Sequence, residues 1–254
     1  MTNDMAAPAG GAYSELQAGL IIGTVERLEQ RIAERFPGSG LSRVAGELAR
    51  IGGETERVVA RLRRPIWTIR IATFAGVVAL IMFALMLASL FVSVPPAASP
   101  GAESLSELLQ GVEAGVNEVV FLSLAVFFLV SLEARVKRRR VIRALHRLRS
   151  IAHIVDMHQL TKDPQFVLGG GKDTASSPRR TLTRFELARY LDYCSELLSL
   201  SSKLAALHVQ YVNDPVVLDA VNDIETLAAS LSNKIWQKIM ILDTVDEEPD
   251  ARRG

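Results

Sequence analysis

The feature that most constrains this chain is a long apolar stretch in its first half. No charged residue occurs from Ile71 to Val94, and two prolines, Pro95 and Pro96, follow directly. At 1.5 Å per residue, a helix of this length covers about 36 Å, which exceeds the ~30 Å hydrocarbon core of a bilayer. A soluble core helix rarely carries so long an uncharged run, so we expect a transmembrane helix over residues 66–94.

A second apolar stretch is shorter and needs its flanks to cross a bilayer. Residues 119–132 carry no charge, and a helix of that length covers only about 21 Å. We therefore expect a span over residues 115–134, with residues 95–114 as the loop between the two spans. This places Glu118 and Glu133 one turn inside opposite ends, where carboxylates can reach headgroups or find partners.

The basic residues predict the orientation of this transmembrane hairpin. Five arginines lie between residues 57 and 70, eight lysines or arginines lie between residues 135 and 149, and residues 95–114 contain none. Basic residues concentrate on the cytoplasmic side of membrane proteins. We expect both termini in the cytoplasm, residues 95–114 outside, and a bacterial inner membrane as the location.

The segment before the first span has a helical pattern. Residues 1–12 are small and polar and predict a disordered tail, and residues 13–64 predict a helical hairpin with a break at Pro37-Gly38-Ser39-Gly40. Its second helix fits one heptad frame, with packing inside the chain and an intermolecular coiled coil as alternatives. The core positions of that frame are Leu41, Val44, Leu48, Ile51, Thr55, Val58 and Leu62.

The segment after the second span predicts a bundle of long helices over residues 135–243, with a loop at residues 161–182. Thr183 and Glu186 form a capping box, and Asp214 before Pro215 is typical of another helix start. Residues 244–254 are expected as an exposed acidic tail. The expected fold class is an all-α membrane protein, in which a transmembrane hairpin follows a cytoplasmic helical hairpin or coiled coil and precedes an antiparallel bundle.

Segregated charge suggests a lipid contact, although the formal net charge is only +1. The stretch from residue 135 to residue 149 has no acidic residue, and each well-placed cation there gains about 1 kcal/mol beside anionic headgroups. Positive-inside placement alone, with only generic surface contact, is the alternative, and nucleic-acid binding is not expected. The candidate headgroup contacts are Arg135, Lys137, Arg138, Arg139, Arg140 and Arg143.

Small residues in the first span predict close helix packing. Ala72 and Gly76 are four residues apart, and Ala79 belongs to a similar small-residue pair. Such a face packs either within the hairpin or between subunits. If subunits assemble around a pore, Glu118 is expected at its outward mouth.

No residue pattern indicates catalysis, a metal site or a cofactor. Cys194 lies on an apolar helix face, the four histidines lack metal-ligand spacing, and Gly169-Gly170-Gly171-Lys172 lacks the rest of a phosphate loop. Tyr190, Tyr193 and Trp236 are expected in bundle packing. No enzymatic activity is therefore predicted.

The layout resembles that of small bacterial two-span proteins with helical cytoplasmic parts, including SLATT-type membrane effectors, and this likeness concerns architecture alone. The sequence favours a non-enzymatic, membrane-anchored helical module for interaction or assembly. Its expected partners are membrane lipids and either copies of itself or another protein. An oligomeric channel or pore-forming effector is the alternative.

Overall fold

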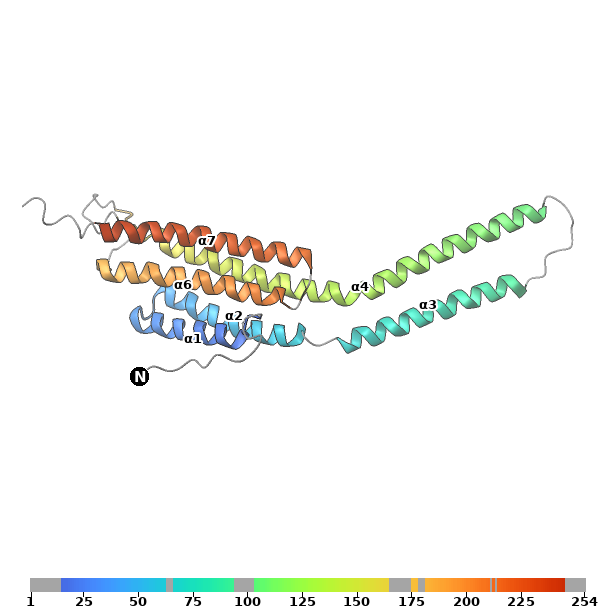
Figure 1. The fold of residues 1–254 in the computed structure, drawn as a ribbon, viewed down its shortest axis with the longest axis horizontal. Coiled ribbons are helices and arrows are strands. Elements are labelled where there is room, and N and C mark those ends of the chain that lie inside the picture. Colours follow the sequence, from blue (N-terminus) through green and yellow to red (C-terminus); the bar gives the residue numbers. More distant parts are fainter. Residues whose placement is uncertain are drawn as a thin grey trace, which may run out of the picture. The chain divides into compact units, whose positions relative to one another are not determined.

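The chain forms α-helices and, within the residues described, no β-strand. The computed structural model describes residues 15–62, 66–93, 103–164, 175–177, 181–210, 212 and 214–244, with the backbone alone at residues 59, 61–62, 87–88, 90–93, 103–109 and 244. Two compact units result, one from residues 1–63 with 138–254 and one from residues 64–137. The helices in Figure 1 are α1 (Ala18–Arg35), α2 (Gly40–Leu62), α3 (Trp67–Ser93), α4 (Glu103–Leu160), α6 (Arg184–Val209) and α7 (Pro215–Thr244).

In the first unit, α1 and α2 pack on each other across a short turn. Gly38 has φ +67°, a left-handed conformation that glycine adopts without steric cost. The Ser39 hydroxyl oxygen then accepts a hydrogen bond from Ser42 N at 3.1 Å, which caps α2. The heptad positions predicted as core are confirmed as buried for Leu41, Val44, Leu48, Ile51 and Thr55. Val58 is partly buried, and the Leu62 side chain lies outside the description.

Both predicted helix starts of the later bundle are confirmed. Thr183 Oγ1 accepts from Glu186 N at 3.3 Å, and Glu186 Oε2 accepts from Thr183 N at 2.8 Å. These bonds to Thr183 lower the pKa of the Glu186 carboxyl. At α7, Asp214 Oδ1 accepts from Val216 N at 3.0 Å, while Pro215 takes the first helical position.

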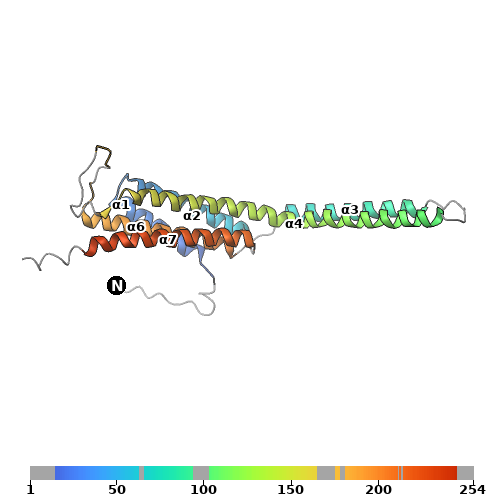
Figure 2. The same ribbon diagram turned by 90° about the horizontal axis from the view of Figure 1, so that it is seen from above.

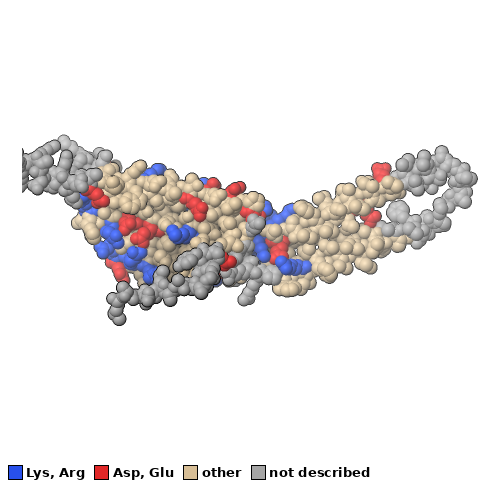
Figure 3. All heavy atoms as spheres, in the orientation of Figure 1, with Lys and Arg blue, Asp and Glu red and all other residues tan. Residues whose placement is uncertain are grey.

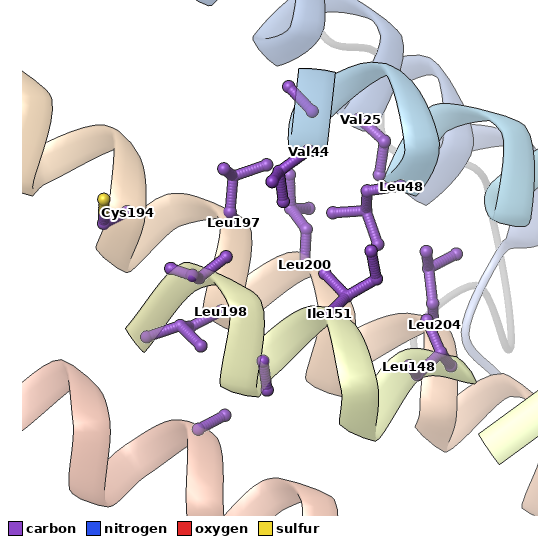
Figure 4. Packing of buried hydrophobic residues seen from close by; sticks show 14 of the residues in the cluster. Val25, Val44, Leu48, Leu148, Ile151, Cys194, Leu197, Leu198, Leu200 and Leu204 are labelled. Carbon is purple, nitrogen blue, oxygen red and sulfur yellow. The ribbon is translucent and has the colours of Figure 1, made fainter. Parts of the chain in front are cut away.

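The core of the first unit is shared by five helices. The apolar stripe of α4 from Val141 to Val155 is buried, and it belongs to the same apolar cluster as α1, α2, α6 and α7. Figure 4 shows Leu48 of α2, Ile151 of α4 and Leu204 of α6 among the side chains that meet there. Helix α6 packs against α1, α2 and α7, so the predicted helical bundle also includes the N-terminal helices.

Polar contacts fix the far end of α4 within this bundle. Lys238 Nζ donates to Gln159 O at 2.8 Å and to Gln159 Oε1 at 2.6 Å. A cation thereby satisfies one of the terminal carbonyls that a helix cannot satisfy itself. The neighbouring His158 ring covers Gly40, where an added Cβ would clash with the ring atoms Cε1, Nδ1 and Nε2. Thus the polar end of α4 contacts both α7 and α2.

In the second unit, α3 packs against the first half of α4. Thr73 Oγ1 donates to Leu129 O at 3.3 Å, and a Cβ added at Gly76 would lie 3.2 Å from Leu129 Cδ1. Trp67–Met86 and a window within Gln110–Leu160 are long and apolar enough to cross a membrane, and none of either window is buried. Figure 2 shows α3 and α4 running alongside each other, and Figure 3 shows an uncharged surface over the middle of this unit.

Some boundaries and one packing prediction differ from the sequence expectation. Helix α4 begins at Glu103, inside the segment expected as a loop, because Gly111 and Gly115 do not outweigh the helix-forming residues around them. Trp236 is 58% exposed, unlike Tyr190 and Tyr193, because it lies one helical step from the buried stripe at Ile235. The predicted tail at residues 1–12, Pro95-Pro96, the glycine run at 169–171 and residues 245–254 lie outside the described residues.

Candidate functional site

The most densely charged site of the second unit surrounds Glu133. Arg70 Nε lies 2.9 Å from Glu133 Oε2, and Lys137 Nζ lies 3.0 Å from Glu133 Oε1. The backbone N–H of Ile66 also donates to Oε1 at 3.3 Å. We call these groups the Glu133 cluster. The carboxylate binds Lys137 one turn further along α4, in the favourable order of acid before base, and ties α3 to α4 through Arg70.

A groove between α3 and α4 lies beside the Glu133 cluster. Its volume is about 450 Å³, within the range of about 300–1,000 Å³ that is typical of ligand sites. The Arg70 side chain is 57% exposed even though its Nε binds Glu133, so the rest of the guanidinium remains accessible. We call this hollow the Arg70 groove, lined by Ile69, Arg70, Thr73, Phe74, Val77, Val130 and Glu133.

Glu118 lies in a second, more apolar pocket of about 240 Å³ between the same two helices. One carboxyl oxygen, Oε1, is buried and has no hydrogen-bond partner within the described structure. Fifteen residues separate Glu118 from Glu133, which corresponds to about 22 Å along α4. The residue predicted for a pore mouth therefore packs against α3 within one chain. The other lining residues are Leu80, Phe83, Ala84, Phe121, Leu122 and Ala125.

The six basic residues predicted to contact headgroups have different surroundings. In the second unit, Lys137 pairs with Glu133, and the Arg135 guanidinium lies 4.9 Å from the centre of the Phe128 ring. In the first unit, Arg138 Nε lies 2.5 Å from Asp214 Oδ2. The contacts of Arg135 and Lys137 lie within α4, whereas Arg138 joins α4 to the start of α7.

The other three of the six basic residues are more exposed to solvent. Arg139, Arg140 and Arg143 are exposed, and none has an acidic partner within the described part of the chain. Arg139 and Arg143 lie on the side of α4 opposite the buried stripe that begins at Val141, and Arg140 lies at its flank. This subset remains suited to an anionic surface.

The small residues predicted to mediate helix packing also differ in their surroundings. Gly76 faces Leu129 of α4, where the two helices approach closely, whereas the side chains of Ala72 and Ala79 are exposed. Packing within one chain, one of the two alternatives for this face, therefore accounts for Gly76. This contact does not account for the two alanines.

Groups suited to catalysis or metal binding are dispersed or buried. Within the described residues, no three or more His, Cys, Asp or Glu side chains assemble into a possible metal site. Cys194 is fully buried, and this burial raises the pKa of its thiol to about 12. His208 is also fully buried, with Nδ1 3.0 Å from Leu204 O.

The pairing of Arg70 with Glu133 is the main site feature that sequence reasoning missed. Glu133 was expected near the end of the second span and Arg70 at the start of the first, so the expected hairpin already predicted that both lie on one side of the membrane. That topology was a sufficient signal to pair them. No family model, curated protein or solved structure matches this chain.

Proposed function

We propose that this chain is an integral membrane protein in which α3 and the first half of α4 form a two-span transmembrane hairpin. The supporting observation is that both apolar windows are unburied, whereas a core helix of a soluble protein would be covered. Large side chains such as Phe74 and Phe121, 73% and 71% exposed, need an apolar environment. A bilayer provides it.

The proposed orientation places the first unit and both termini in the cytoplasm of a bacterial cell, at the inner membrane. The ends of the spans that carry Arg70, Arg135 and Lys137 would lie at the cytoplasmic headgroups, in accordance with the positive-inside rule. The Glu133 cluster supports this orientation because its carboxylate is neutralised by two cations at the expected boundary.

Membrane fractionation followed by alkaline extraction tests insertion, and cysteine labelling tests topology. In a Cys194→Ala background, Ser176→Cys should resist an impermeant maleimide in intact cells, whereas Ser104→Cys should react. Labelling of both after permeabilisation controls for accessibility. Extraction of the protein by alkali would contradict insertion, and the opposite labelling pattern would contradict the orientation.

We further propose a non-enzymatic role, in which the cytoplasmic bundle binds another protein or other copies of this chain. Exposed apolar side chains on the bundle, including Met157, Phe185, Trp236 and Met240, support an interaction role. The oligomeric state of the chain in lipid nanodiscs tests self-assembly, with Trp236→Ser and the exposed control Asn233→Ser compared. This role would be contradicted if the native chain is a monomer in nanodiscs and binds no protein from its native membrane.

A pore is the second candidate function, and Glu118 is the observation that favours it. A half-buried carboxyl with an unpartnered oxygen inside a span is costly unless water or another chain reaches it. Planar-bilayer recording should compare the native chain with Glu118→Gln and with the exposed control Glu113→Gln. A cation-selective current that is reduced only by Glu118→Gln would support the pore, and no current from a confirmed oligomer would exclude it.

A further inference from the structure

The charges of the Glu133 cluster do not balance. Arg70 and Lys137 both bind the same carboxylate, so the cluster carries one net positive charge. Within the same unit, Arg135 adds another cation, which contacts the ring of Phe128 instead of a carboxylate. The end of the second unit that carries Arg70 is therefore suited to an anion.

The Arg70 groove extends from this charge into an apolar surface. Phe74 and Val77 follow Arg70 by one and two turns along α3, and Val130 forms the facing wall on α4. Arg70 donates to Glu133 through Nε, and a guanidinium has further N–H donors directed away from that bond. A ligand for this groove needs an anionic head and an apolar body.

We propose that the Arg70 groove binds one anionic phospholipid, with its phosphate on the Arg70 guanidinium and an acyl chain against Phe74, Val77 and Val130. Charge complementarity argues for the anionic head, and the apolar walls argue against a free phosphate ion. This inference rests on the proposed membrane insertion. It assigns lipid recognition to a groove between two helices in addition to the exposed arginines of α4.

Arg70→Gln is the most direct test because it removes the guanidinium and leaves the other contacts of the Glu133 cluster in place. Glu133 keeps Lys137 and the Ile66 N–H as partners, so the substitution does not strand the carboxylate. Arg27→Gln is the matched control, since that arginine is exposed, lies outside the groove and is not among the predicted headgroup contacts. Val77→Trp fills the groove without changing its charge, and Leu124→Trp introduces the same side chain at a residue that does not line the groove and is 63% exposed.

The experiment is native mass spectrometry of the full chain after delipidation and addition of phosphatidylglycerol or phosphatidylcholine. The native chain should retain one phosphatidylglycerol in preference to phosphatidylcholine. Arg70→Gln should weaken this retention about fivefold, the factor expected for one basic side chain at an anionic surface. Val77→Trp should also weaken it, whereas Arg27→Gln, Leu124→Trp and saturating inorganic phosphate should leave it unchanged.

Several results would overturn the proposal. Equal retention by the native chain and Arg70→Gln, an equal loss in Arg27→Gln, or displacement of the lipid by inorganic phosphate would each do so. A native dimer that holds no lipid would assign the groove to a second copy instead. Alkaline extraction separates the two levels of inference, because a chain that resists extraction but shows no selective retention contradicts the lipid site alone.

Discussion

Arg138 of α4 binds Asp214 at the start of α7, with Nε 2.5 Å from Oδ2. The same carboxylate accepts from Val216 N through Oδ1 at 3.0 Å. Asp214 is only 9% exposed, so one shielded side chain both caps α7 and connects that helix to α4. This pairing lies three residues before the buried stripe of α4 begins at Val141.

Asp214→Ala should destabilise the bundle because it removes the cap of α7 and the partner of Arg138. Loss of an N-cap costs about 0.5–2 kcal/mol, and loss of the ion pair adds to this. The expected result is a lower thermal midpoint of the full chain, measured by circular dichroism. Asp219→Ala, an exposed acidic residue in the same helix, is the control, and an equal effect of both variants would contradict the proposed role.

Leu198→Asp should prevent assembly of the bundle core. Leu198 of α6 is fully buried, and a buried, unpaired carboxylate is among the few changes that cost more than about 4 kcal/mol. Leu198→Ala should cost about 2–5 kcal/mol through the cavity it leaves. The neighbouring Ser199 is exposed, so Ser199→Asp should change the melting curve little. A native-like melting curve for Leu198→Asp would refute this packing.

The bundle should lose stability in mild acid because of His208. Burial lowers the pKa of His208, and Nε2 has no partner within the described structure. The folded state thus favours the neutral ring, and its contribution, complete above pH about 6.5, is lost as the pH falls through the lowered pKa.

Thermal midpoints at pH about 7.5 and about 5 measure this loss of stability. His208→Met should reduce the difference between the two midpoints, while His153→Gln, a change at an exposed site, should not. Burial also lowers the pKa of His158, so part of the pH dependence should remain in His208→Met. An unchanged difference in that variant would show that His208 does not contribute.

Cys194 should be unreactive in the folded protein. Its side chain is fully buried, and its thiol pKa of about 12 leaves almost no thiolate at neutral pH. Maleimide labelling should therefore appear only after denaturation. Ser199→Cys in a Cys194→Ala background should label at once, and rapid labelling of native Cys194 would indicate that α6 opens locally.

Gly40→Ala should destabilise the contact between α2 and the end of α4. A Cβ at this position would collide with the His158 ring, so the ring must move. His158→Ala should remove that cost, which makes the two substitutions non-additive in a double-mutant cycle of thermal midpoints. Gly46→Ala meets open space in the same helix and is the control. Additive effects would show that the ring already lies elsewhere.

Local chemistry explains most of what the sequence predicted correctly. The capping box at Thr183 depends on residues three positions apart, and the heptad stripe through Leu48 depends on helical periodicity alone. Contacts such as Arg31 with Glu196, at 2.6 Å, join helices that are far apart in sequence. They depend on the relative register of packed helices, which no local pattern specifies. Trp236 is exposed because it follows Ile235 of the buried stripe by one position, and aromatic character alone does not specify a helix face.

The bundle core is formed by helices that are far apart in the sequence, and this has a consequence for biosynthesis. The helices α1 and α2 are complete at Leu62, but α6, which covers them, begins only at Arg184. At about 5–20 residues per second, the ribosome needs roughly 6–24 s to synthesise the intervening residues. During that interval Leu28, Leu41 and Leu48, fully buried in the finished protein, lack their partners on α6. The nascent chain should therefore present a chaperone-binding surface until translation reaches the end of α6.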